Sequence, residues 1–296
     1  MTRRGWFLFA SMCVIWGVPY LMIRVAVREL SPVTLVFART GIAALLLLPI
    51  AAARGELRPL LPRWRQLALF SAVEIAIPWL LLSSAERRIT SSLAGLLIAA
   101  VPLVGTAVTA AMGDRDVLDA RRLAGLALGI VGVAALVGPD VGNTSAAALL
   151  EMAGVAVCYA VGPIILSRTL DDAPPLGVVA SSLALAAVVY APVAAFQLPG
   201  AWPQAKVIAS VLGLAVLCTA IAFLLFFALI AEAGPVRATV ITYVNPAVAA
   251  VLGVALLSES FTTGMGVGFV LILAGSVLAT GRVRGAPARE LAVAEP

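Results

Sequence analysis

The chain has no histidine, and among its 296 residues it has only three cysteines and one lysine. The lack of histidine removes the commonest general base and the commonest metal ligand. All three cysteines, Cys13, Cys158 and Cys218, lie inside apolar runs. This placement is typical of small buried hydrophobic residues and not of a disulfide framework or a metal site. We therefore expect no metal ion and no cofactor.

Charged residues are also scarce. They make up 12% of the chain, whereas 62% of the residues are hydrophobic and the mean hydropathy is +1.09. A soluble domain is about a quarter charged, so this much apolar surface indicates a lipid environment. The net charge of +5 comes from arginines in short loops, a distribution that sets membrane topology and does not build a nucleic-acid-binding face. No phosphate-binding loop is present, which argues against ATP hydrolysis by this chain.

Long apolar runs are what the sequence does contain. A helix needs about 20 apolar residues to cross the hydrocarbon core, and continuous runs of this length disfavour a β-barrel. We expect an all-α polytopic membrane protein with ten transmembrane helices. Their predicted ranges are 6–23, 33–53, 65–83, 91–112, 121–138, 146–167, 176–196, 206–230, 236–257 and 263–281. Residues 282–296 are rich in alanine, proline and charge, and we expect a disordered tail there.

The distribution of basic residues predicts the orientation. If the N-terminus is cytoplasmic, the inner segments hold 14 arginines and the outer segments hold five basic residues. The positive-inside rule then predicts that both termini are cytoplasmic. We expect the protein in the plasma or inner membrane of the cell.

The two halves of the chain resemble each other, and we expect repeats at 6–138 and 146–281. A shift of 143 or 144 residues brings Pro19 onto Pro163, Arg24 onto Arg168, Pro102 onto Pro246, Trp16 close to Tyr159 and Gly132 onto Gly275. Five spans are an odd number, so the second half is predicted to enter the membrane from the opposite side. Inverted repeats suit alternating access, because the halves can exchange roles about a pseudo-two-fold axis.

Several short motifs follow one another in a fixed order. They are Trp16-Gly17-x-Pro19, Phe37-Ala38-Arg39, Ser92-x-Ala94-Gly95 leading to Pro102, Arg237-Ala238 leading to Pro246, and Leu256-Leu257-Ser258-Glu259 followed by Gly268 and Gly275. In this order the chain resembles an EamA-type ten-helix transporter of the drug/metabolite transporter superfamily. One departure is Ser258, which stands where the family often has glycine. The resemblance implies export or exchange of small metabolites, often amino acids or toxic compounds.

Two of the charges within the predicted spans stand out, because charge away from the ends of a span is expensive and often functional. Glu74 lies near the middle of the third span and is a candidate proton-coupling carboxylate or anchor for a substrate amine. Arg39 lies in the second span and is a candidate ligand for a substrate carboxylate. The two could instead pair with each other or serve structure alone. The counterpart of Glu74 in the second half lies near Cys218, so the acid is not part of the repeat.

Aromatic and polar residues inside the spans are weaker candidates for substrate contact, with core packing as the alternative. They are Trp16, Tyr20, Trp79, Tyr159, Thr242, Tyr243 and Asn245. Pro19, Pro102, Pro163 and Pro246 are candidate helix breaks or hinges, because proline removes a backbone donor. Gly125, Gly129 and Gly132, and likewise Gly264, Gly268 and Gly275, are expected to pack helices closely within a monomer or across a homodimer contact.

The pattern therefore predicts a secondary-active transporter and no enzyme, with a small-molecule substrate, the lipid bilayer and possible proton coupling as its partners. Two alternatives stay open. One is an intramembrane enzyme acting on lipid-linked substrates, and the other is a non-transporting membrane scaffold.

Overall fold

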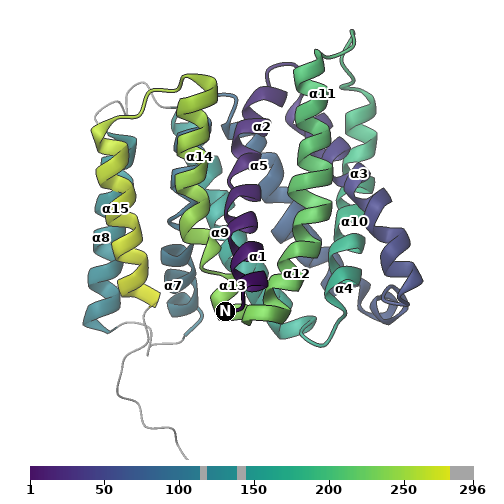
Figure 1. The fold of residues 1–296 in the computed structure, drawn as a ribbon, viewed down its shortest axis with the longest axis horizontal. Helices are drawn as coiled ribbons and strands as arrows, with labels where there is room; N and C mark the ends of the chain where they lie inside the picture. Colours follow the sequence, from purple (N-terminus) through teal and green to yellow (C-terminus); the bar gives the residue numbers. More distant parts are fainter. Residues whose placement is uncertain (114–118, 139–144, 281–296) are drawn as a thin grey trace, which may run out of the picture.

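The computed structural model describes residues 1–113, 119–138 and 145–280, and within these ranges every regular element is a helix (Figure 1). In the first half the elements are α1 (Arg3–Ile15), α2 (Val18–Ala26), α3 (Pro32–Ala53), η1 (Arg58–Arg63), α4 (Trp64–Ser71), η2 (Ala72–Ala76), α5 (Ile77–Ala85), α6 (Ser91–Ile98), α7 (Val101–Ala111) and α8 (Ala120–Val137). In the second half they are α9 (Ala146–Thr169), α10 (Pro175–Ala195), α11 (Ala205–Leu212), η5 (Gly213–Ile221), α12 (Ala222–Ala233), α13 (Pro235–Ala238), α14 (Ile241–Leu257) and α15 (Thr263–Thr280). The tail predicted at 282–296 lies outside the described residues.

Among the described residues, eight helical stretches are long and apolar enough to cross a membrane, judged by length and composition. The pair α6 and α7, bent by 41° at the break between them, forms a ninth such stretch, and α14 is a shorter apolar helix of 17 residues. Each predicted span coincides with one of these stretches. The all-helical polytopic class is thus confirmed, whereas the count of ten and the side of the termini stay predictions.

The helices pack in pairs that join the two halves. α8 packs along α15, α3 along α10 and α6 against α14, so each of these helices meets its counterpart from the other half. α5 packs on α9, and α1 packs on α12. If each helix is replaced by its counterpart in the other half, the same five helix pairs result: three of them join counterparts, and α5–α9 and α1–α12 change places. In Figure 1 the α8–α15 pair forms one flank of the bundle, and α3 and α10 lie at the other.

The glycines of α8 and α15 face one another in a seam where the backbones nearly touch. A Cβ added at Gly132 would lie 2.8 Å from the Ile272 nitrogen, and one at Gly275 would lie 2.6 Å from the Gly125 oxygen. Gly268 and Gly264 meet the backbone of α8 in the same way, and Gly129 instead receives the side chain of Leu103. The close approach of small residues is the usual basis of membrane helix packing. Here the contact is made within one chain.

Helix breaks occur beside two of the four prolines singled out in the sequence. α1 ends and α2 begins just before Pro19, and the bend between α6 and α7 lies just before Pro102. α9 and α14 instead continue through Pro163 and Pro246, so a helix break at these two residues is wrong, and their role as hinges stays a prediction. A proline deletes one backbone hydrogen bond, and neighbouring helices allow a membrane helix to continue past that loss.

Ser258 ends α14 in the left-handed conformation, with φ of 56°. It is the one non-glycine residue of the described chain with positive φ. Glycine adopts this conformation at no steric cost, which explains why glycine is common at this position in the resembling family.

Candidate functional site

Glu74 lies on η2, a short π-helical segment in the middle of the third span. Pro78, just beyond the segment, has no N–H to offer the Glu74 carbonyl four residues earlier. The backbone instead forms longer-range bonds, such as that from the Ile77 nitrogen to the Ala72 oxygen. Tyr190 of α10 donates to the Ala76 oxygen at 3.0 Å. Such π segments are frequent at functional sites, because they turn a side chain away from its regular direction.

The carboxyl group of Glu74 points at α9. Its Oε2 atom is buried and has no hydrogen-bond partner. A Cβ built on Gly162 would lie 3.0 Å from Glu74 Cδ and would overlap Oε2, so only glycine leaves room for the carboxyl at this contact. A buried oxygen without a partner is costly, and buried polar groups in proteins are nearly always satisfied. Glu74 Oε2 therefore lacks the hydrogen bonds that usually compensate a buried carboxyl oxygen.

Arg39 of α3 is buried, with 7% of its surface exposed. Its Nε donates to Thr219 Oγ1 at 3.0 Å, and its guanidinium carbon lies 3.6 Å from the centre of the Trp79 ring. Thr219 lies on η5, which is a second π segment, and its hydroxyl donates to the Leu214 oxygen five residues earlier at 2.7 Å. The aromatic face and the hydroxyl hold the planar guanidinium in one orientation.

Glu74 and Arg39 do not pair. None of the three ion pairs found among the described residues includes either side chain. Tyr159 of α9 is within electrostatic reach of both Glu74 and Arg39, and its hydroxyl contacts the Trp79 side chain. Tyr20 of α2 is buried nearby, within electrostatic reach of Arg39 and Tyr159. The structure thus places five of the predicted candidates around one centre between α2, α3, α5, α9 and the π segments.

The two π segments occupy corresponding places in the repeat. A shift of 144 residues carries Glu74 onto Cys218, which lies within η5 and is an electrostatic neighbour of Arg39. The backbone irregularity is therefore shared by both halves, although only the first half carries an acid there.

The remaining candidates lie elsewhere. Trp16 packs on Phe223 and Phe226 of α12, with ring centres 5.9 and 4.7 Å apart. Asn245, with its amide oriented to suit its neighbours, donates to the carbonyls of Cys13 and Ile241 at 3.0 Å, and so ties α14 to α1. Thr242 donates to the Thr239 oxygen at the start of α14, and the Tyr243 hydroxyl lies 3.5 Å from Thr280 Oγ1. These contacts give Trp16 and Asn245 packing roles and leave Thr242 and Tyr243 away from Glu74.

Two clefts lie beside α7 and α8. The first, of about 340 Å³, is lined by Pro102, Gly105, Thr106, Thr109, Arg122, Ala160, Ile164, Ala279 and Thr280. The second, of about 450 Å³, is almost wholly apolar and lies between α7 and α8. Neither is lined by Glu74 or Arg39, so these clefts do not hold the charged centre.

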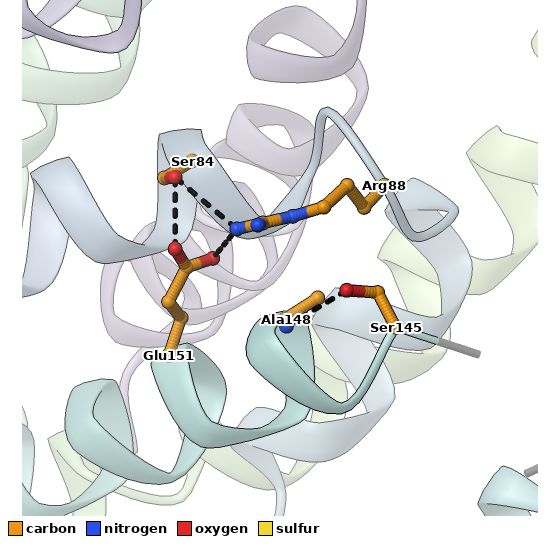
Figure 2. Close-up of polar contacts among 5 residues, drawn as sticks. All are labelled: Ser84, Arg88, Ser145, Ala148 and Glu151. Carbon is orange, nitrogen blue, oxygen red and sulfur yellow. Dashed lines mark hydrogen bonds and ion pairs between the residues drawn. The ribbon is translucent and has the colours of Figure 1, made fainter.

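Polar contacts between the halves frame the centre, and sequence reasoning missed most of them. Glu151 of α9 accepts from Ser84 at 2.9 Å and pairs with Arg88 beyond the end of α5 (Figure 2). At the same end, Glu259 accepts four hydrogen bonds from the backbone nitrogens and hydroxyls of Ser91 and Ser92, at the start of α6. Glu86 is fully buried there. In the sequence these acidic residues lie next to predicted loops. A carboxylate in such a place is ordinarily expected to be solvated at the membrane interface, which is why their contacts were not predicted.

The other end of the bundle is tied as well. Arg63 of η1 pairs with Asp172, which follows α9, and its Nη2 lies 2.8 Å from Oδ2. Glu56 accepts from the Gly177 nitrogen of α10 at 2.9 Å. In the described part of the chain, no group of three or more histidines, cysteines or acids is arranged to hold a metal ion.

Comparison with known proteins assigns the family. The EamA-like transporter family matches residues 3–138 and again residues 146–281. The chain belongs to this family. Together the two matches cover almost the whole chain.

Relatives of the EamA family extend the comparison. The chain is 29% identical to the uncharacterized inner membrane transporter YedA of Escherichia coli K12 over 261 residues, which is 85% of this chain and 82% of YedA. It is 23% identical to the uncharacterized transporter YvbV of Bacillus subtilis over 97% of this chain and 95% of YvbV. A protein crystal structure with 22% identity shares the fold, with a TM-score of 0.64 over 95% of this chain and 97% of that one. Like its family, the chain is a multi-pass protein of the plasma membrane.

Proposed function

We propose that this EamA-family chain is a secondary-active transporter that exports or exchanges small polar metabolites by alternating access. The substrates we favour carry both an amine and a carboxylate, as amino acids do. The observation that carries the proposal is the buried, unpaired Glu74 oxygen at the centre of the bundle. A carboxyl without a partner there is suited to binding a proton or an amine.

Arg39 supplies the complementary charge. It is buried and oriented by Trp79 and Thr219, and no carboxylate of the described chain lies within ion-pair distance of it. A guanidinium held in this way matches the geometry of a carboxylate. Because Arg39 and Glu74 do not pair with each other, the two opposite charges are free to hold the two ends of a zwitterion.

Alternating access rests on the repeat. We take the second half to be inserted oppositely to the first, with both termini in the cytoplasm and two units at 6–138 and 146–281. Two properties support this arrangement: the bias of basic residues, and helix pairs that survive exchange of the halves. Ties between the halves at both ends of the bundle are then the contacts that open and close in turn.

The experiment is counterflow of labelled solutes into proteoliposomes, with and without a proton gradient. We expect Glu74→Gln to abolish gradient-driven transport. Arg39→Gln should weaken transport of carboxylate-bearing solutes by about tenfold or more, since a hydrogen bond to a charged group contributes about 1.5–3 kcal/mol. The matched control is Glu29→Gln, a carboxylate at one end of the bundle that accepts only from the Gln204 nitrogen.

Transport of every amino acid at the wild-type rate by both variants would contradict the assignment of the central site. The absence of counterflow for any solute in the panel would contradict transport itself, and would favour the enzyme or scaffold alternative.

A further inference from the structure

Glu86 is the only acidic residue of the described chain that is completely buried, and the proposed transport site does not use it. The residue has 0% of its surface exposed, and neither Oε1 nor Oε2 has a hydrogen-bond partner. It caps the C-terminal end of α5, where its backbone nitrogen bonds to the Leu82 oxygen. An ionised carboxylate in such a place would have no compensation for its lost water.

The nearest cation does not compensate this carboxyl group. Arg24 of α2 donates through Nη1 to the backbone oxygen of Glu86 and not to its side chain. The titratable or charged groups that face Glu86 from the neighbouring elements are Tyr20 and Arg24 of α2, Arg39 of α3 and Glu259 between α14 and α15. The start of α6 contributes Ser91 and Ser92, which are bound to Glu259.

These surroundings disfavour the ionised form of the carboxyl group. Burial raises the pKa of Glu86 well above its usual range, and the charge of Glu259 adds to this effect while Arg24 and Arg39 oppose it. Because the raised pKa belongs to the closed arrangement, that arrangement is favoured at low pH. The preference is lost as the pH rises through this raised value.

We propose that Glu86 is a proton-binding site whose protonated form keeps this end of the bundle closed and which releases its proton when this end opens to water. On release, the O–H bond of the Glu86 carboxyl breaks and the proton passes to water. The guanidinium of Arg24, already at the Glu86 carbonyl, then turns to the new carboxylate. The proton site stands on burial and contacts alone, whereas the link to opening rests on the alternating access proposed above.

The position of Glu86 makes this link effective. Glu259 fastens the second half to the start of α6, and Arg88 fastens the turn after Glu86 to Glu151 of α9. Water can reach Glu86 only if contacts of this kind give way. In the proposed orientation this is the outer end, so the proton would be exchanged with the outside.

Infrared spectroscopy of the protein in lipid nanodiscs tests the proton site. We expect carboxylic-acid C=O bands at neutral pH, one of which is missing in Glu86→Gln and unchanged in the control Glu29→Gln. Equal bands in wild type and Glu86→Gln would overturn the proposal. If Glu86→Gln does not fold, the Glu74→Gln protein decides, because one protonated buried carboxyl should remain in it. A spectrum without such a band would overturn the proposal.

Hydrogen–deuterium exchange of the amides at 87–93 tests the link to closure. Wild type and Glu86→Gln are compared at the same pH, so that the intrinsic exchange chemistry cancels. We expect equal rates in acid and several-fold faster exchange of wild type in alkali, where Glu86 loses its proton. Equal rates at every pH would overturn the link. If no solute is transported in the counterflow assay, the proposed transport function is refuted. The infrared test of the proton site at Glu86 is independent of that outcome.

Discussion

Glu74 and Gly162 are a matched pair at the residue scale. The carboxyl on η2 occupies the space that a side chain on α9 would fill, so the acid and the glycine need each other. Glycine destabilises a helix relative to alanine. At position 162 this loss of helix stability is offset by the space that glycine leaves for the Glu74 carboxyl group. The position of the buried acid is thus set by the residue opposite as much as by its own helix.

Gly162→Ala should therefore abolish transport nearly as completely as Glu74→Gln, because the new methyl group displaces the carboxyl. The control is Gly105→Ala on α7, where an added Cβ would meet Ala160 at an ordinary 3.9 Å. Counterflow in proteoliposomes measures the effect, with thermal stability followed in parallel. Wild-type transport by Gly162→Ala would show that Glu74 does not need its present position.

Glu259 is a second residue whose role depends on its contacts. Its four hydrogen bonds cap α6, and those bonds from Ser92 and Ser91 lower its pKa despite the opposing effect of burial. A carboxyl with a lowered pKa contributes stability above the unfolded pKa. That contribution is lost as the pH falls through the folded value.

We expect Glu259→Ala to lower the free energy of unfolding by about 2 kcal/mol at neutral pH, the scale of hydrogen bonds to a charged group. The difference from wild type should shrink in acid, as Glu259 itself becomes protonated. Thermal unfolding in detergent across a pH series measures both. Glu29→Ala, which removes a single backbone contact at the same end, is the control; an equal loss in the two variants would contradict the capping role.

At the scale of elements, the lengths of the apolar runs in the sequence predicted the positions of most membrane-spanning helices. The ends of the spans fall within a few residues of the helix ends, because a charged or proline-rich break must leave the membrane. The π segments could not be predicted, since a proline follows η2 two residues after its end whereas η5 forms with no proline within it. The burial of Glu86 could not be predicted, because the two arginines that follow it, Arg87 and Arg88, indicate a solvent-exposed helix end.

The α8–α15 seam gives an element-scale prediction. Gly275→Val places a branched side chain where a single Cβ already lies 2.6 Å from the Gly125 oxygen, so the helices must separate. We expect a destabilisation of about 3 kcal/mol or more and a sharp loss of monodisperse protein on size-exclusion chromatography. Gly266→Ala on the same helix, which would meet only Phe261 at 3.4 Å, should behave as wild type. Normal yield of Gly275→Val would contradict the close contact.

At the scale of the whole molecule, ion pairs and hydrogen bonds connect the two halves at both ends of the bundle. Arg63–Asp172 lies at one end, and Ser84, Arg88 and Glu151 lie at the other (Figure 2). Arg63 lowers the pKa of Asp172, so this pair is present at neutral pH and weakens in acid as Asp172 becomes protonated. Exposed pairs contribute little to stability, but they can bias an equilibrium between two closely balanced conformations.

Breaking one tie should therefore open one end only. In Asp172→Asn we expect faster hydrogen–deuterium exchange at 170–178 and unchanged exchange at 84–92, and the reverse in Glu151→Gln. The double exchange Arg63→Asp with Asp172→Arg should restore the wild-type pattern, because it restores the pair. Faster exchange at both ends in either single variant would indicate general loosening and contradict alternation.

The recurrence of a π segment in both halves has a consequence for how the family diversifies. The backbone distortion that aims a side chain at the centre exists at 74 and again at 218, whereas the acid occupies only the first. Either of the two positions can carry the charge without any change of fold. A chain with an acid at the position of Cys218 and a neutral residue at that of Glu74 is thus accessible by two substitutions. Its acid would approach the same centre from η5.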